Sequence, residues 1–410
     1  MFIRSKATCA APIVFVQVPD PVGSRLRLIR IERRPKREAM AASGKRRKAK
    51  KAARTKAGSR TRTRTTAADT GPVSLTEAKA LAQVRQPKLA MRAARKRAAP
   101  PASPAPVGAE REKLEKERRE EFKRRIREYK ATMEIMKTRG ARRPRPKKTA
   151  KPKGEEPASE GDSFVPLQIF AEGDSWFDYP VPFFGGGIIP RLENRLGVPI
   201  LNLAKAGDEV RYMLGVEERI ILTEHLSDGC PAGGPWDVLL FSGGGNDIVG
   251  NPMALWIKDW DPAVPPANHI NQPRFNNAMA LVRAGYEDLI LLRDQLSPGT
   301  HLIFQDYDFA IPDGRGVCGF GPWLKPTFDL RKFPLGAARK DVVKAMLLQF
   351  ATMLNSLATA PNVTFINGQG TLPPKTSSWS NELHPSRAGF EKFADIFQAE
   401  LKLLFPDRVA

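Results

Sequence analysis

The sequence is poor in the residues that bind metals or form disulfides. Its 410 residues include three cysteines and four histidines. Cys9, Cys230 and Cys318 lie far apart and no pair has the CxxC spacing, so neither a zinc ribbon nor a disulfide framework is supported. The histidines show no metal-ligand spacing either, and we expect no metal and no cofactor. Isolated cysteines in odd number fit a reducing compartment, and we expect a cytoplasmic protein.

Long apolar runs are missing as well. No stretch approaches the ~20 apolar residues that a helix needs to cross a membrane. The run at residues 11–18 follows two basic residues, as a signal peptide would, but it is short, contains a proline and a glutamine, and lacks a cleavage site in the usual place. We therefore do not expect a signal peptide. Met40 lies just before a polybasic tract, so either Met1 or Met40 could begin the translated chain.

Charge is spread unevenly over the chain, whose formal net charge is +23. Residues 1–160 hold 46 Lys and Arg against 16 Asp and Glu, a charge of +30. The remainder holds 21 basic and 28 acidic residues, a charge of −7. A basic arm therefore precedes a mildly acidic body.

The arm contains few large apolar residues. Residues 44–65 are a polycationic low-complexity tract, and residues 99–106 are rich in proline. Low hydrophobicity with high charge buries too little apolar surface to offset the entropy of ordering. We therefore expect residues 1–108 to be disordered, and residues 141–163 to be a linker rich in Pro and Lys.

One segment of the arm, residues 109–140, is predicted to be a charged helix. Its apolar residues recur with spacings of four and three over about two heptads: Phe122, Ile126, Tyr129, Met133 and Met136. Two interpretations remain open. The segment is either a solvated single helix held by ion pairs four residues apart, or a short coiled coil that associates with a second copy.

Residues 164–410 alternate predicted strands and helices. The apolar runs typical of buried strands are residues 166–173, 198–204, 236–243, 301–308 and 363–368. The predicted helices are residues 190–197, 209–226, 274–296, 337–357 and 386–405. This alternation predicts an α/β domain, a three-layer α/β/α sandwich around a five-stranded, mostly parallel sheet.

Small and polar residues follow the predicted strands. In such folds ligands bind beyond the carboxyl ends of the strands. Ser175 follows the first strand, Gly-rich turns with Gly207 and Asn246 follow the second and third, and His384 comes after the last. A serine, a histidine and donors for an oxyanion are the groups that acyl transfer requires.

Together these residues resemble the SGNH hydrolases, also called GDSL-type esterases and lipases. The resemblance spans residues 164–405, and its four blocks occur in the family's order: Gly173-Asp174-Ser175, Gly207, Gly244-Gly245-Asn246-Asp247 and His384-Pro385. It implies the flavodoxin-like SGNH fold. It also implies a serine ester hydrolase that acts through an acyl-enzyme on an O-acyl ester, such as a lipid or an acetylated sugar.

The resemblance also assigns roles. Ser175 would be the nucleophile and His384 the general base. The backbone N–H groups of Ser175 and Gly207, with the side-chain amide of Asn246, would form the oxyanion hole. Asp174 and Asp247 are expected to hold neighbouring loops by hydrogen bonds.

One position departs from the family's pattern. The family carries Asp three residues before the histidine, and this chain has Asn381 there. Asn can orient an imidazole but cannot stabilise imidazolium by charge. Either Asn381 orients His384, or Glu382 does, or an acid at the end of the fourth strand, Asp306 or Asp308, takes this role. We favour Asn381.

A second hypothesis follows from the same departure and from the basic arm. The chain could be a polyanion-binding or scaffold protein with a weakly active or vestigial hydrolase domain. Residues 24–160 would attract nucleic acid or another polyanion without sequence preference, since they contain no base-reading module. A run of charge can also be only a solvating tail.

Two further features near the serine have open interpretations. Residues 311–326, which have glycine near both ends, are expected to be an insertion on the substrate side. Aromatic residues beside Ser175 either belong to the core or line an acyl pocket: Trp176, Phe177, Tyr179, Phe183 and Phe184.

Overall fold

The computed structural model describes residues 15–19, 26–30, 71–85, 107–142, 144, 163–179, 186–317 and 320–409. The chain divides into two units, Met1–Thr66 and Ala67–Ala410. In the first, strands β1 (Phe15–Pro19) and β2 (Leu26–Arg30) pair as an antiparallel hairpin. Most of the segment expected to be disordered, and of the segment expected to bind polyanions, lies outside the described residues.

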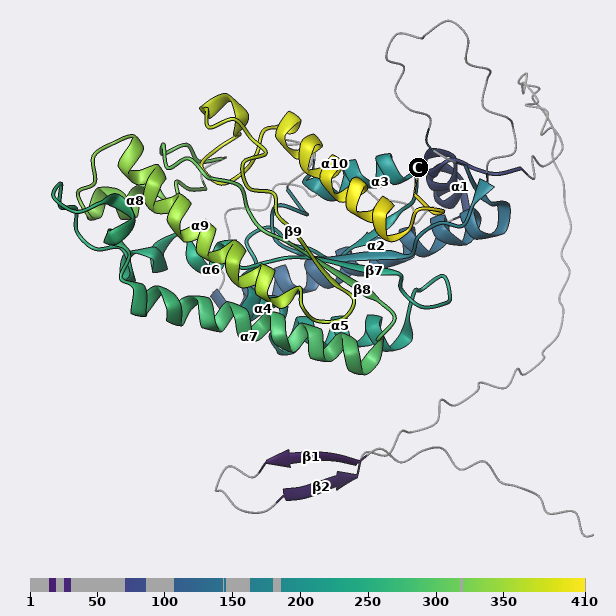
Figure 1. Ribbon diagram of the computed structural model, residues 1–410. Helices are drawn as coiled ribbons and strands as arrows, with labels where there is room; N and C mark the ends of the chain where they lie inside the picture. The colour runs from purple at the N-terminus through teal and green to yellow at the C-terminus, as the bar shows by residue number, and fades with distance from the viewer. Residues whose placement is uncertain are drawn as a thin grey trace, which may run out of the picture. The chain divides into compact units, whose positions relative to one another are not determined.

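The second unit is built around a five-stranded sheet (Figure 1). Every neighbouring pair of strands is parallel and the order is β6-β5-β7-β8-β9. Every residue of β5 and β7 is buried, as expected for a sheet covered on both faces. The strands are β5 (Ile169–Gly173), β6 (Ile200–Asn202), β7 (Val238–Ser242), β8 (His301–Gln305) and β9 (Val363–Ile366).

Helices cover both faces of the sheet, which confirms the predicted three-layer sandwich. On one face lie α3 (Ile188–Leu196) and α10 (Arg387–Leu404) (Figure 1). The opposite face carries α4 (Val210–Met213), α5 (Val216–Asp228), α7 (Gln272–Leu296) and α9 (Ala337–Leu357). Shorter helices are α6 (Gly245–Ile248), α8 (Lys325–Leu330), η1 (Asn251–Leu255), η2 (Pro266–His269) and η3 (Thr376–Ser378). No helix of the described residues is long and apolar enough to cross a membrane.

The helix predicted at residues 209–226 is two helices in the structure. It breaks at Gly215, which precedes α5 with an extended backbone. Glycine is a weak helix former because its backbone loses the most freedom on ordering.

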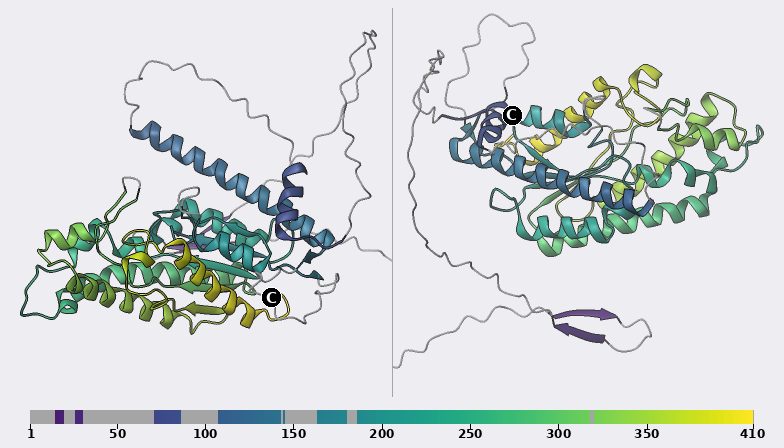
Figure 2. Two further views of the ribbon diagram at one scale, coloured as in Figure 1. Left: turned by 90° about the horizontal axis from the view of Figure 1, so that it is seen from above. Right: turned by 180° about the vertical axis from the view of Figure 1, so that it is seen from behind.

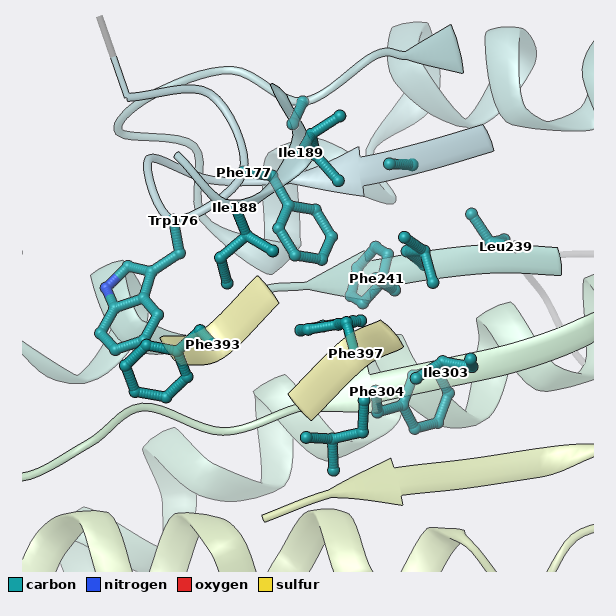
Figure 3. Packing of buried hydrophobic residues seen from close by; sticks show 14 of the residues in the cluster. Trp176, Phe177, Ile188, Ile189, Leu239, Phe241, Ile303, Phe304, Phe393 and Phe397 are labelled. Atoms are coloured by element: carbon teal, nitrogen blue, oxygen red, sulfur yellow. The ribbon is translucent and has the colours of Figure 1, made fainter. Parts of the chain in front are cut away.

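The core fills both faces of the sheet, and one part of it lies where α3 and α10 meet the strands. Trp176 and Phe177, directly after the candidate serine, insert between the strands and α10 (Figure 3). The ring of Phe177 lies 5.9 Å from that of Phe397, and the ring of Trp176 lies 4.9 Å from that of Phe393. The chain after β5 is therefore anchored by buried aromatic rings, which fixes the position of Ser175.

Helix α2 (Val107–Arg139) packs against the sheet domain (Figure 2). It contacts the edge strand β6. The residues with helical spacing form its inner face: Phe122, Tyr129, Met133 and Met136 are buried and Ile126 is half-buried. The segment is a single helix with ion pairs four residues apart, as the first interpretation has it, and the correction concerns its apolar face. The apolar stripe is neither solvated nor free to pair with a second copy, because it is covered by the body of the same chain.

Helix α1 (Leu75–Arg85) lies inside the segment expected to be disordered and packs on α2. Ser74 and Glu77 form a capping box at its start: the hydroxyl of Ser74 accepts from the N–H of Glu77 at 3.3 Å, and the Glu77 carboxylate accepts from the N–H of Ser74 at 2.8 Å. Ala78 and Ala82 are buried, so two small side chains allow α1 to pack closely.

A short strand pair joins these helices to the sheet domain. β3 (Ala141–Arg142) pairs antiparallel with β4 (Ser163–Phe164), and Val73 forms a further bridge to Ala141. The predicted linker 141–163 therefore has paired backbone at both ends.

Candidate active site

Ser175 lies in a tight turn directly after β5. Asp174 organises this turn: its Oδ1 accepts from the N–H of Trp176 at 2.9 Å, and its Oδ2 accepts from the hydroxyl of Tyr307 at 2.7 Å. Burial raises the pKa of Asp174 to about 7. As the sequence predicts, Asp174 holds a loop by hydrogen bonds, and it leaves the next residue to face the site.

His384 meets Ser175 across the carboxyl edge of the sheet. Nε2 of His384 lies 2.6 Å from Oγ of Ser175. The two residues are 209 positions apart in the chain, and both are buried. An imidazole at this distance can take the proton of the serine hydroxyl during attack on an acyl group.

Asn381 orients the imidazole. Its Oδ1 lies 2.9 Å from Nδ1 of His384 and also accepts from the backbone N–H groups of Leu383 and His384, both at 2.9 Å. Because this oxygen accepts, Nδ1 carries the ring proton and Nε2 is free to accept from the serine. The amide nitrogen of Asn381 donates to the hydroxyl of Tyr179 at 2.9 Å.

The imidazole of His384 lies between two aromatic rings. Tyr179 stacks on it with a centroid distance of 4.3 Å and an interplanar angle of 24°, and Trp323 approaches edge-on at 5.9 Å. Burial lowers the pKa of His384 to about 3. The base is therefore neutral, and ready to accept a proton, at every pH above about 4.

The three acids considered as alternatives to Asn381 have other partners. Asp306 accepts from the N–H of Gly368 at 2.7 Å, and Asp308 accepts from the N–H groups of Gly370 and Leu372, also at 2.7 Å. Glu382 is turned toward the loop at residues 311–326. Of the positions that the sequence left open, only Asn381 contacts the Nδ1 side of His384 within the described residues.

The candidate oxyanion donors lie at the ends of β5, β6 and β7. Asn246 lines the same pocket as Ser175 and His384. One N–H of its amide donates to the carbonyl of Asp208 at 2.9 Å, which leaves the other N–H for a substrate. Among the residues that the structure describes, no acceptor binds the backbone N–H of Ser175 or Gly207.

Two glycines give these loops their shape. Gly207 has φ of +89°, a left-handed conformation that side chains other than glycine rarely adopt, and a Cβ placed there would face open space. Gly244 has φ of +99°, and a Cβ there would lie 2.7 Å from the ring of Phe350. The first glycine permits a turn that other residues would strain, and the second allows α9 to approach the end of β7 closely.

A small pocket adjoins Ser175, with a cavity volume of about 40 Å³. Trp176 and Tyr307 form part of its wall. Most of its other lining is aliphatic: Ile248, Val249, Leu324, Val343, Met346 and Leu347. The site therefore has room for only a small apolar group beside the nucleophile.

The loop at residues 311–326 closes one side of this pocket through Leu324. The buried carboxylate of Glu382 holds it by accepting from four backbone N–H groups, at 2.6–3.0 Å, of Gly314, Trp323, Leu324 and Lys325. The expected substrate-side insertion does reach the pocket, with residues 318 and 319 outside the described part.

The aromatic residues beside Ser175 serve different purposes. Phe177 belongs to the core, Trp176 lines the pocket, and Tyr179 stacks on His384. Phe183 and Phe184 lie outside the described residues. Sequence reasoning missed Tyr307, and it did not predict that Tyr179 contacts His384 and Asn381. The hydroxyl of each is bonded to a side chain that supports the Ser–His pair, and only the short distance of Tyr179 from the motif hinted at this.

The remaining histidines lie elsewhere. His301 bonds Thr364 at 2.8 Å, and His269 accepts from the N–H of Asp261 at 3.0 Å. Burial lowers the pKa of His225 to about 4. In the described part of the chain, no three His, Cys, Asp or Glu side chains gather as a metal site.

Comparison with known proteins gives structural likenesses only. No protein-family model matches the chain, and no curated protein does. A lipase from a goat rumen metagenome is 16% identical with a TM-score of 0.37, over 57% of this chain and 96% of that chain. An extracellular lipase from Streptomyces rimosus is 14% identical with a TM-score of 0.36, and the match covers 57% of this chain and 99% of that lipase. A salicylyl-acyltransferase from a tetracycline biosynthetic pathway is 12% identical with a TM-score of 0.34, over 60% and 58%. Likenesses of this size carry no argument about activity.

Proposed function

We propose that the chain is a serine ester hydrolase of the SGNH type that acts through an acyl-enzyme. The observation that carries this proposal is the contact of 2.6 Å between Ser175 Oγ and His384 Nε2. It is supported by the bond from His384 to Asn381, and by the position of Asn246 in the same pocket. No metal or cofactor takes part in the proposed steps.

Acylation begins when Ser175 Oγ attacks the carbonyl carbon of the ester. His384 Nε2 takes the hydroxyl proton, and the carbonyl oxygen becomes an oxyanion. The N–H groups of Ser175 and Gly207 and the amide of Asn246 donate to it. Removal of one such donor typically costs ~3–4 kcal/mol of barrier. The imidazolium then gives its proton to the departing alcohol, and an acyl group remains on Ser175.

Deacylation repeats the same steps with water. His384 takes a proton from the water as its oxygen attacks the acyl carbon, and the same donors bind the second oxyanion. The bond to Ser175 Oγ then breaks, and the serine recovers its proton from His384 as the acid leaves.

The lining and the small volume of the pocket support an ester whose acyl group is apolar and short. The side chains nearest the nucleophile are aliphatic, and Leu324 restricts the pocket from the side of the 311–326 loop. Burial of each additional CH₂ of an acyl chain would contribute about 0.8 kcal/mol until the pocket is filled. We expect kcat/KM to rise with acyl length over short chains and then to level off.

A comparison of Ser175→Ala with wild type on p-nitrophenyl esters of graded acyl length tests the proposal. We expect the variant to lose at least ~10³-fold in kcat/KM, because the nucleophile is removed. A fluorophosphonate probe should label wild type at Ser175 and leave the variant unlabelled. Ser356→Ala, at an exposed serine of α9, is the matched control. Equal rates for wild type and Ser175→Ala would overturn the proposal.

A further inference from the structure

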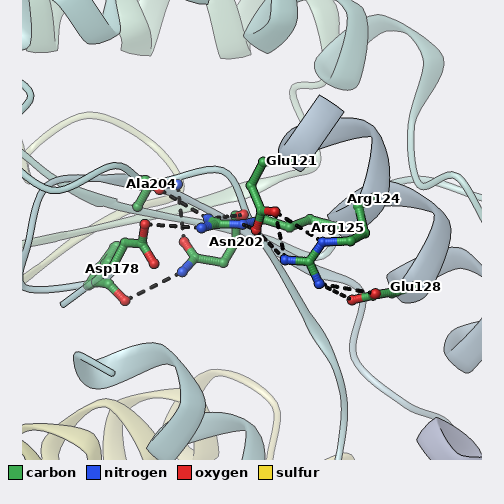
Figure 4. Close-up of polar contacts among 8 residues, drawn as sticks. Glu121, Arg124, Arg125, Glu128, Asp178, Asn202 and Ala204 are labelled. Atoms are coloured by element: carbon green, nitrogen blue, oxygen red, sulfur yellow. Dashed lines mark hydrogen bonds and ion pairs between the residues drawn. The ribbon is translucent and has the colours of Figure 1, made fainter. Parts of the chain in front are cut away.

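Two arginines of α2 reach from the edge of the sheet to the loops that surround Ser175. Arg125 donates through Nη1 to the carbonyl oxygens of Asn202 and Ala204, both at 3.1 Å (Figure 4). Through Nη2 it donates to the carboxylate of Asp178, also at 3.1 Å. One guanidinium thus joins the end of β6 to the chain that follows the candidate nucleophile.

Asp178 belongs to the turn that presents Ser175. Its backbone N–H donates to the carbonyl of Asp174 at 3.0 Å, which closes the turn around the serine. Asn202 tightens the same contact, since its side-chain amide donates to the carbonyl of Phe177 at 3.4 Å. A shift of the Arg125 guanidinium would therefore move the backbone on which Ser175 lies.

Arg118 holds the neighbouring loop, which carries Gly207. Its Nη2 donates to the carboxylate of Asp208 at 3.0 Å and pairs with Glu218. Lys205 pairs with the other oxygen of Asp208 at 2.8 Å. The carbonyl of Asp208 is also the acceptor that fixes the amide of Asn246. Arg118 is thus linked through Asp208 to two candidate oxyanion donors. Asp208 directly follows Gly207 in the chain, and its carbonyl bonds the amide of Asn246.

The two arginines differ from Arg124 of the same helix in their surroundings. Their side chains are 24% and 22% exposed, whereas Arg124 is 53% exposed and pairs with Glu121 and Glu128 of its own helix. Arg118 and Arg125 are separated by two helical turns and flank Phe122, which is buried against the body. The apolar face of α2 therefore sets where both guanidinium groups lie.

We propose that Arg118 and Arg125 are positioning residues of the catalytic site, through which α2 holds the nucleophile turn and the oxyanion loop in their reactive arrangement. The proposal rests on the hydrolase function proposed above. Donors that stabilise an oxyanion act only when they are already aimed at it, and a misplacement of about 1 Å can cost ~10²-fold in rate. Neither arginine touches the reacting atoms, so each acts through the loop that it holds.

The test compares Arg118→Ala and Arg125→Ala with the matched control Arg124→Ala in the full-length protein. We expect the first two to lower kcat 10- to 100-fold with KM changed by less than threefold, and the control to keep wild-type values. The affinity for an alkyl trifluoromethyl ketone, which forms a tetrahedral adduct with the serine, should fall in parallel with kcat/KM. Assays are run well below the melting temperature of each variant.

Two further measurements separate positioning from loss of folding. Guanidinium ion added at millimolar concentration should restore part of kcat in Arg125→Ala, because it can occupy the vacated site between the carbonyls and Asp178. Arg118→Lys should recover more activity than Arg118→Ala, since it keeps a charge beside Asp208. Wild-type kcat in both alanine variants, or a loss that neither guanidinium nor Arg118→Lys reverses, would overturn the inference.

The two proposals fail in different ways. If Ser175→Ala hydrolyses esters as well as wild type, the proposed function itself is wrong. If Ser175→Ala is inactive while Arg118→Ala and Arg125→Ala match Arg124→Ala, the hydrolase function stands and α2 has no part in positioning its site.

Discussion

At the scale of single residues, Asn381 distinguishes this site from a triad with a carboxylate. Its Oδ1 fixes the tautomer and the orientation of His384, which a carboxylate would do as well. A neutral amide adds no charge, however, so the imidazolium that forms during attack is stabilised only by the hydrogen bond. Burial lowers the pKa of His384 to about 3, and its neutral form is correspondingly a weak base.

Asn381→Asp should therefore increase activity. The carboxylate would keep the bond to Nδ1 and could accept a hydrogen bond from Tyr179, and its charge would favour the imidazolium. We expect kcat to rise about tenfold or more. The pKa of His384 should rise as well, so the variant should lose activity at acidic pH where wild type keeps it. The measurement is kcat/KM from pH 4 to pH 8.

Asn381→Ala serves as the control for this substitution. It removes the acceptor without adding charge, and we expect it to lower kcat at every pH. An unchanged pH profile in Asn381→Asp would mean that position 381 does not act on the imidazole.

At the scale of elements, the loop at residues 311–326 depends on one buried carboxylate. Glu382 is fully buried and accepts from four backbone N–H groups of this loop. Hydrogen bonds to a charged group contribute about 1.5–3 kcal/mol each, and a buried donor left without an acceptor is costly. The loop therefore keeps Leu324 in the pocket through a side chain that lies next to Asn381 in the sequence.

Glu382→Gln should loosen this loop. The amide nitrogen of Gln would face backbone N–H groups instead of accepting from them. We expect a loss of about 2–4 kcal/mol in the free energy of unfolding, and a higher KM for esters with apolar acyl groups. Urea unfolding and steady-state kinetics measure the two effects. Glu287→Gln, which removes an exposed ion pair on α7, should change the stability by less than about 0.5 kcal/mol; equal effects of the two variants would contradict this role of Glu382.

The sequence predicted the elements that carry the family motif better than those that precede it. Predicted and observed bounds of α9 agree at residues 337–357, and each predicted strand contains the observed one, because buried parallel strands are unbroken apolar runs. Helix α1 was missed although Ser74 and Glu77 form a capping box, a signal that sequence alone contains. Because α1 is short and has low overall hydrophobicity, its composition resembles that of the segment around it, which was predicted to be disordered.

The arginines of α2 show why the rest of the site could not be predicted. Arg118 and Arg125 continue the spacing of four and three that Phe122 and Tyr129 begin, so they lie on the inner face of the helix. The sequence could therefore predict the face of the helix on which these arginines lie. It could not predict which loop each guanidinium contacts, because most residues of the segment are charged. The choice among Asn381, Glu382 and the acids after β8 likewise depended on contacts between distant segments.

At the scale of the whole molecule, helices cover both faces of the sheet, and several acidic side chains are buried between these layers and at the ends of the strands. Burial raises the pKa of Asp306 to about 7, and the pKa values of Asp174 and Glu218 also to about 7. A folded-state pKa above the unfolded value adds stability that is fully present below about pH 4 and is lost as pH rises toward 7. Neutral buried His384 and His225 act in the opposite direction below about pH 6.5.

Asp306→Asn isolates one of these contributions. The amide keeps an oxygen for the N–H of Gly368 and cannot ionise. We expect wild type to lose on the order of 2 kcal/mol more than the variant between pH 5 and pH 8. Unfolding in urea at four pH values measures the difference. Asp341→Asn, at an exposed position of α9, should follow wild type; a variant curve parallel to that of wild type would show that Asp306 does not titrate in this range.

The packing of α2 also determines which N-terminal truncations of this protein would still fold. The change in composition suggests a domain that starts at residue 164, but Tyr129 lies 5.6 Å from Trp236 and its hydroxyl contacts Cys230. A fragment beginning at residue 164 would expose Trp236 and Cys230 to solvent. It would also leave the backbone of Phe164 without its pairing partner, Ala141. Exposed apolar surface beside an unpaired strand favours aggregation. We therefore expect that the shortest fragment that folds without aggregating begins near Ala67.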